Sequence, residues 1–198
     1  MEAQIAVKQD TKTTLIKTGM DLMLQKGYSN TGIQEVLTAS NVPKGSFYHY
    51  FDSKEQFAVA IIRYFDQICS EDLQQILSNR ERSPIERLRD YCEYSKANLV
   101  AQECSKGCLI GNLSQEMSDQ SEVLRKELSF VMNKRRDTLA ACIEEAQRLK
   151  EIRSSTSAHK LAEFFSAAWG GAVMMAKTVK NSESLDVFIE LMFNNVLI

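Results

Sequence analysis

Residues 42–51, VPKGSFYHYF, place a lysine, a serine and a histidine among aromatic side chains directly behind a proline. Ammonium, hydroxyl and imidazole groups can donate hydrogen bonds to phosphate oxygens or to base edges. On a short helix, Lys44 and Ser46 would lie in the first turn, which reaches base edges, and Tyr48 and His49 would follow beside the phosphates. The stretch therefore has the residue types for contact with nucleic acid. The alternative is a tightly packed helix corner whose aromatic residues are core.

Cys108 is the second candidate for chemistry. It falls at the expected start of a helix, two residues after Lys106. A helix N-terminus and a cation both lower the pKa of a thiol, and the thiolate is the reactive form. Cys108 is therefore a candidate sensor thiol, with Cys104 as a candidate resolving partner, although a free cysteine is commonly a small buried residue. The other cysteines fall at apolar helix positions and are expected to be packing residues: Cys69, Cys92 and Cys142.

Other chemistries lack the residues they need. The two histidines, His49 and His159, are far apart in the sequence, and no metal cluster, nucleophile–base pair or glycine-rich phosphate loop is evident. We expect neither an enzyme nor a cofactor. Lys and Arg number 24 against 26 Asp and Glu, so overall charge does not favour nucleic acid and that case rests on local arrangement.

No apolar segment has the length of a signal peptide or a membrane span. The N-terminus lacks an apolar core, and the uncharged run 164–176 is too short to cross a bilayer. We expect a cytoplasmic protein with no membrane partner.

The elements that must position these residues are predicted to be helices. Only two prolines and eight glycines occur in 198 residues, so few helix breakers interrupt the chain. Thr31 is expected to cap one helix and Pro43 to lie in the first turn of the next. No alternating strand pattern is found. Apolar periodicity predicts an all-α fold of about nine helices: one ending at Lys26-Gly27, then 31–39, 43–51, 54–77, 84–102, 109–117, 121–151, 157–180 and 184–196.

The helices at 31–39 and 43–51, joined by a short turn, have the dimensions of a helix-turn-helix. Such a unit places its second helix in the major groove of DNA. Gly45 would permit close approach of the backbone, and Lys54 with the start of its helix would give a further phosphate site. We place this DNA-binding domain in residues 1–55 and a second, helical domain in residues 56–198.

The sequence of this module resembles the DNA-binding region of TetR-family repressors over roughly residues 10–65. Gly27-Tyr28, Thr31-Gly32-Ile33, the run 42–51 and Ser53-Lys54-Glu55 carry the match, whereas Asn41 stands where the family usually has glycine and Tyr50 where histidine is common. The resemblance implies a homodimer that binds a palindromic operator, represses transcription and is released when an effector enters the second domain. It places eight residues at the DNA: Thr31, Pro43, Lys44, Gly45, Ser46, Tyr48, His49 and Lys54.

The second domain holds a run of small residues, 166–172, that includes Gly170 and Gly171. Two glycines cost a helix about 2 kcal/mol in propensity, and close helix–helix approach would explain them. In the family the last two helices form the four-helix bundle of the dimer, so we expect these glycines in the dimer interface. The alternative is a crowded core within one chain. Phe188, Leu191 and Met192 on the last helix would supply the apolar partner face.

Two effector mechanisms remain open. The stretch Cys108-Leu109-Ile110-Gly111-Asn112-Leu113 looks like the NemR-type subgroup, which senses electrophiles and oxidants through such a thiol. The alternative effector is a small apolar ligand held reversibly between the middle helices, with Trp169 in the lining. The basic cluster at 133–137 is expected to be a solvated face. A hypothesis of a different class is an all-α enzyme or helical binding protein with a vestigial helix-turn-helix.

Overall fold

The computed structural model describes residues 2–198 and, among side chains, those from Thr11 onward. Over this range the chain is helical and contains no strand, which confirms the all-α prediction. The helices are α1 (Glu2–Lys26), α2 (Ile33–Ser40), α3 (Lys44–Tyr50), α4 (Lys54–Leu77), α5 (Pro84–Ala101), α6 (Leu109–Met117), α7 (Glu122–Arg148), α8 (Ala158–Val179) and α9 (Glu183–Leu191), followed by a π-helical turn (Met192–Val196). Within the same range, no helix is both long and apolar enough to cross a bilayer.

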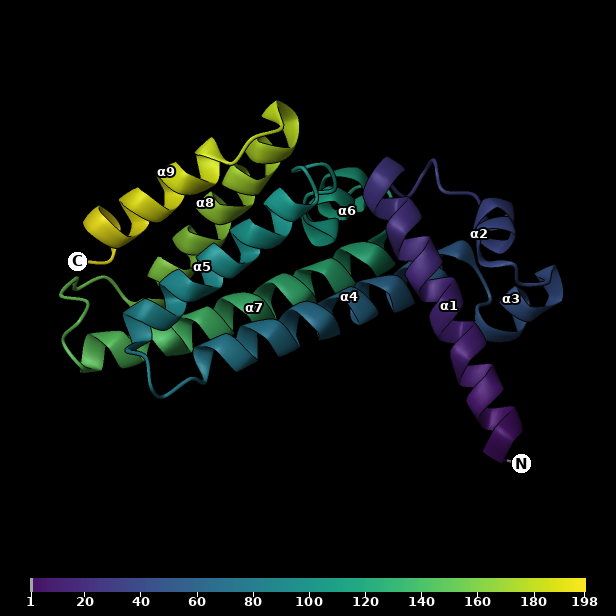
Figure 1. Cartoon of the computed structure of the whole chain (residues 1–198), viewed down its shortest axis with the longest axis horizontal. Coiled ribbons are helices and arrows are strands. Elements are labelled where there is room, and N and C mark those ends of the chain that lie inside the picture. The colour runs from purple at the N-terminus through teal and green to yellow at the C-terminus, as the bar shows by residue number, and fades with distance from the viewer. Residues whose placement is uncertain (1) are drawn as a thin grey trace.

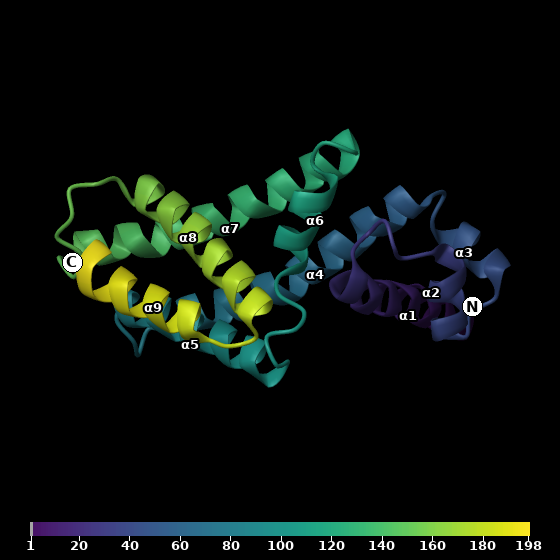
Figure 2. The same ribbon diagram turned by 90° about the horizontal axis from the view of Figure 1, so that it is seen from above.

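The molecule is elongated, with α1, α2 and α3 at one end and α5, α8 and α9 at the other (Figure 1). The long helices α4 and α7 run side by side and contact each other. Turning the molecule by 90° places α6 between the α1–α3 end and the remaining helices (Figure 2). Helix α6 is therefore the short element through which the two ends can be connected.

Serine side-chain caps account for the starts of α4, α5, α7 and α8. The hydroxyl of Ser53 accepts a hydrogen bond from the N–H of Gln56, and Ser83 and Glu86 form a reciprocal capping box in front of α5. Asn41 ends α2 in the left-handed conformation, with φ of 53°, as its amide side chain favours.

Two starts differ from the sequence prediction. The N-cap of α2 is Gly32 rather than Thr31, so no side chain caps the start of this helix. Pro43 is the N-cap of α3, one residue before the first turn in which we expected it. Thr31 does not cap α2 because its hydroxyl donates to the carbonyl of Gly27, which precedes it in the chain.

Two hydrophobic cores divide the molecule. The first joins α1–α3 to the start of α4, to α6 and to the start of α7, and its members include Leu15, Phe47, Phe57, Leu113 and Leu128. The second joins the far halves of α4 and α7 to α5, α8 and α9, and its members include Leu73, Leu88, Ile143, Phe165 and Phe188. Because α4 and α7 contribute to both cores, a displacement in one core can be transmitted along these helices to the other.

Candidate nucleic-acid interface and sensor site

The outer face of α3 is held in place by a cluster of aromatic rings on its inner face. The ring of Phe47 is fully buried, with centroids 5.3 Å from Phe51 and 5.1 Å from Phe57. Phe51 and Phe57 are themselves 4.8 Å apart. Burial of three rings in edge and tilted contacts fixes the rotation of a helix that is too short to be stable alone.

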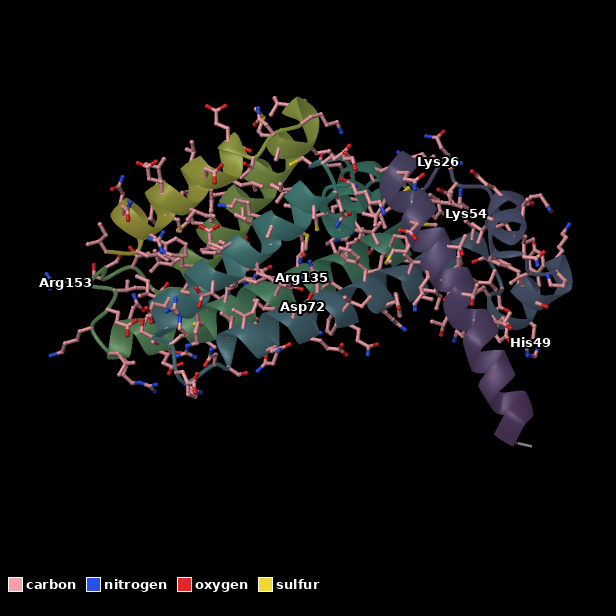
Figure 3. The ribbon with its side chains drawn as sticks, viewed as in Figure 1. Lys26, His49, Lys54, Asp72, Arg135 and Arg153 are labelled. Carbon is pink, nitrogen blue, oxygen red and sulfur yellow. The ribbon has the colours of Figure 1, made fainter. Side chains whose placement is uncertain are left out.

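The polar residues of α3 lie on the opposite face, which is free. Lys44, Gly45 and His49 are exposed, and Tyr48 keeps 50% of its surface accessible. Ser46 is half-buried between them. His49 lies on the side of α3 away from the second domain (Figure 3). The structure thus brings five of the predicted contact residues to one open surface, together with the exposed ring of Pro43.

Thr31 is not on this surface, contrary to the sequence prediction. Only 1% of it is exposed, its hydroxyl donates to the carbonyl of Gly27 at 2.7 Å, and its N–H donates to the carbonyl of Tyr28 at 3.1 Å. Thr31 therefore stabilises the turn between α1 and α2, and its hydroxyl is not accessible to a ligand.

Lys54 is held against the α1–α2 turn. Its ammonium lies 4.3 Å from the centroid of the Tyr28 ring and donates to the carbonyl of Ser29 at 3.4 Å. Burial lowers the pKa of Lys54, an effect that Glu116 opposes and Lys26 reinforces. The Lys54 side chain is half-buried. A lysine free to contact phosphate would instead extend into solvent.

Glu116 on α6 connects the second domain to the same turn. Its carboxylate accepts hydrogen bonds from the backbone N–H groups of Tyr28 and Ser29, both at 2.7 Å. Burial opposes ionisation, but the hydrogen bonds from Ser29 and Tyr28 and the charge of Lys54 outweigh it and lower the pKa of Glu116. Glu116 could not be predicted from the sequence, because no local pattern marks contacts between residues 87 and 88 positions apart.

Cys108 is the N-cap of α6 and packs between the two cores. Lys106 is not its cationic partner as we expected, because the Lys106 ammonium pairs with Asp21 of α1 at 3.2 Å. Burial opposes the charge of Arg135 on α7, but the acidic groups around it, Cys108 first among them, raise its pKa, so Arg135 is a cation within electrostatic range of Cys108. Arg135 had been assigned to a solvated face, and only 19% of its side chain is exposed. That assignment was wrong for Arg135.

The remaining cysteines have environments that suit packing residues. Burial raises the pKa of Cys69 and of Cys142 to about 11, and it raises the pKa of Cys92 as well. These three thiols therefore stay protonated and weakly nucleophilic at neutral pH. Cys104 is a free thiol with 3% of its surface exposed. No group of three potential metal ligands occurs among the described residues.

Helix α8 has an exposed face at Gly170 and Gly171. Both are exposed, and a Cβ added to either would meet no atom within 4 Å. Phe164, about two turns before, and Met174, one turn after, are 53% and 57% exposed. An intrachain core is therefore not the reason for these glycines.

Two residues assigned to this face point inward instead. Phe188 and Met192 are 7% and 2% exposed and belong to the second core, where the Phe188 ring packs 5.1 Å from Phe165 and 5.0 Å from Trp169. The exposed large apolar residues of α9 are Val187 and Leu191. Trp169 is half-buried against Phe188.

Comparison with known proteins assigns this architecture to a family. Residues 15–61 match the family model for bacterial regulatory proteins of the tetR family, and residues 84–192 match that for the tetracyclin repressor-like C-terminal domain. The chain belongs to the TetR family.

Individual relatives of this TetR-family chain cover most of its length. It is 34% identical over 183 residues to the transcriptional repressor DhaR of Mycobacterium sp. (strain GP1), covering 92% of this chain and 90% of DhaR. It is 30% identical over 179 residues to the repressor NemR of Escherichia coli K12, covering 90% of each. The reduced form of E. coli NemR superposes with a TM-score of 0.84 at 31% identity, covering 93% of this chain and 96% of NemR. A regulatory TetR protein from Rhodobacter sphaeroides gives 0.87 at 33% identity, covering 91% of this chain and 96% of that one.

The protein is accordingly a TetR-family transcriptional repressor, as the sequence resemblance implied. The alternative of an all-α enzyme is set aside, because the relatives that cover nine-tenths of the chain are named transcriptional repressors.

Proposed function

We propose that this TetR-family repressor binds a palindromic operator as a homodimer and leaves it when a small effector, or modification of Cys108, acts on the second domain. The observation that carries the proposal is the open polar face of α3 on its buried aromatic support. A helix so oriented can enter a major groove without rearrangement of its own core.

Within α3, position suggests a division of roles. Lys44, Gly45 and Ser46 lie in the first turn and would face base edges, whereas Tyr48 and His49 would hydrogen-bond phosphates. Fluorescence anisotropy with DNA from upstream of the protein's own gene tests this. Affinity should fall steeply as salt rises, because neutralised phosphates release counterions. Substitution of Ser46 should change the preference among operator variants by about 1–3 kcal/mol. Absence of binding to any such fragment at low salt would overturn the proposal.

The dimer is supported by the exposed α8–α9 face. Two recognition helices must lie about 34 Å apart, or somewhat more, to enter successive major grooves, which needs a second copy. Since a side chain at Gly171 meets nothing within its own chain, Gly171→Leu should leave the monomer folded and block only the approach of a partner helix. Analytical ultracentrifugation should give a dimer for wild type and a monomer for the variant. A monomeric wild type at micromolar concentration would contradict the proposal.

Release from DNA has a short structural route in this chain. Cys108 caps α6, and Glu116 near the other end of α6 holds the N–H groups of Tyr28 and Ser29. An adduct on Cys108 would add volume at the start of α6, shift that helix and move the α1–α2 turn with it. A change of about 1.4 kcal/mol between the two states weakens binding tenfold. Mass spectrometry should find the first adduct of a quinone on Cys108, because burial raises the pKa of Cys69, Cys92 and Cys142.

A further inference from the structure

The guanidinium of Arg135 on α7 has one end without a partner. Its Nε donates to Oδ1 of Asp66 on α4 at 3.3 Å, whereas its Nη2 is buried and has no hydrogen-bond partner. Arg135 lies in the middle of the second domain, among α4, α5 and α7 (Figure 3). A buried charged donor without an acceptor is costly, so it needs an explanation in terms of what it binds.

Asp66 cannot complete the pairing of Arg135, because it is already shared. The Nζ of Lys134 donates to its Oδ2 at 2.7 Å, and the hydroxyl of Ser70 donates to its Oδ1 at 3.0 Å. Two cations thus share one carboxylate, which leaves a surplus of one positive charge.

The electrostatic neighbours of Arg135 come from three different elements. Cys69 of α4, Tyr91 of α5 and Cys108 at the start of α6 are its electrostatic neighbours. Burial raises the pKa of Tyr91 to about 12 and that of Cys69 to about 11, yet both side chains keep accessible surface. Accessible surface on strongly desolvated side chains indicates an internal space rather than the outer surface of the protein.

We propose that the free edge of Arg135 binds the carboxylate of a small organic effector whose other end lies against Cys108. A guanidinium edge matches a carboxylate in shape and donor spacing, and the Tyr91 hydroxyl can donate a further hydrogen bond. A monoanion balances the single surplus charge, whereas a phosphate dianion would bring a second negative charge close to Asp66. This site rests on the proposed function, because it names the chemical class of the effector.

A matched pair of alkylating reagents tests the site directly. Iodoacetate carries a carboxylate and iodoacetamide a neutral amide, and both react in the same way: the thiolate sulfur forms a bond to the CH2 carbon, iodide leaves, and the thiol proton goes to the buffer. The rate at Cys108 is followed by mass spectrometry. The iodoacetate-to-iodoacetamide rate ratio is then divided by the same ratio for glutathione. We expect the normalised ratio to be raised roughly tenfold or more by the local positive charge.

Variants and a competitor assign the effect to Arg135. Arg135→Gln should bring the normalised ratio to about one, whereas Lys126→Gln, which removes an exposed cation of the same helix that does not pair with Asp66, should leave it raised. Propionate should slow alkylation of wild-type Cys108 by iodoacetate, and propionamide at the same concentration should not. The competition needs no variant, so it decides the question even if circular dichroism finds Arg135→Gln unfolded. A wild-type ratio equal to that of glutathione, with no effect of propionate, would overturn the site.

Failure of this site and failure of the proposed function give different results. If the normalised rate ratio at Cys108 is about one and both reagents release operator DNA, Cys108 is the sensor and the carboxylate site is wrong. If iodoacetate selects Cys108 through Arg135 but the modified protein still binds operator, the carboxylate site stands and release through Cys108 is wrong.

Discussion

The DNA-binding end and the middle of the second domain are built in opposite ways. Around α3 the apolar rings of Phe47, Phe51 and Phe57 pack inward and the polar side chains point outward. In the second domain polar groups point inward. The buried side-chain polar atoms without a hydrogen-bond partner among the described residues are Nε of Arg87, Nη2 of Arg135 and Oγ of Ser166, and all three belong to this domain.

The difference matches the functions proposed for the two regions. A recognition helix must keep one geometry, and a filled apolar core gives it a single low-energy arrangement. A sensor must have two conformations whose free energies lie within a few kcal/mol. Buried donors without a hydrogen-bond partner destabilise the ligand-free conformation, and a ligand that accepts from them removes this cost. The contacts of α6, above all Glu116, join the rigid part to the adjustable part.

The largest effect should come from opening the rigid core. Phe47→Ala should lower the free energy of unfolding by about 3–5 kcal/mol and abolish operator binding, because a fully buried ring is replaced by a cavity. Urea denaturation and fluorescence anisotropy measure the two effects. Phe130→Ala is the control: this ring is 64% exposed, and its loss should change stability by less than about 0.5 kcal/mol. Equal stability of the two variants would show that the aromatic cluster does not support α3.

A smaller effect should come from the connection between the two regions. Glu116→Gln removes a charged acceptor from two backbone N–H groups and should cost about 1 kcal/mol, allowing for partial exposure of the carboxylate. Asp119→Asn, on an exposed carboxylate nearby, is the control and should be neutral. Operator binding by Glu116→Gln should persist, and its release on modification of Cys108 should weaken.

The pH dependence of that effect has a definite sign. Because the fold lowers the pKa of Glu116, its stabilisation is complete above the ordinary carboxyl value of 4.5 and is lost as the pH falls through the folded value. The stability difference between wild type and Glu116→Gln should therefore be greatest at neutral pH and narrow below pH 4.5. A difference that grows on acidification would mean that the carboxylate is not the stabilising form.

An effect of similar size, on DNA affinity alone and not on stability, should come from one phosphate contact at the rigid end. Tyr48→Phe removes a hydroxyl that is exposed in the free protein, so folding should be unaffected and DNA affinity should fall by about 0.5–1.5 kcal/mol on every sequence alike. Tyr94→Phe, whose hydroxyl donates to Asp72 in the second domain, should leave affinity unchanged. A loss confined to one operator sequence would place Tyr48 at a base instead.

Local features of the sequence were enough to predict the helices and the exposed face of α3. Capping by Ser53 and Ser83 and the left-handed turn at Asn41 depend on neighbours within a few residues, which is why local sequence is enough to place these helix ends. The prediction that Thr31 caps α2 was wrong, because a threonine hydroxyl can bond to residues before or after it in the chain, and here it donates to the carbonyl of Gly27.

Contacts between distant elements could not be predicted in this way. The last helix is apolar on two sides, so periodicity alone did not decide whether Phe188 and Met192 or Val187 and Leu191 face inward. The same holds for Arg135. The cluster 133–137 is typical of a solvated face, but only 19% of the Arg135 side chain is exposed. The partners of Lys106 and Glu116 are set by tertiary packing.

We propose that the chemical state of Cys108 decides whether α3 stays on the operator. The most direct test compares wild type with Cys108→Ser in operator-binding titrations before and after treatment with benzoquinone and removal of the excess reagent. We expect equal Kd values before treatment, at least a tenfold weaker Kd for treated wild type, and no change for the treated variant. Release of Cys108→Ser as readily as wild type would contradict the account and favour a reversible ligand in the second domain.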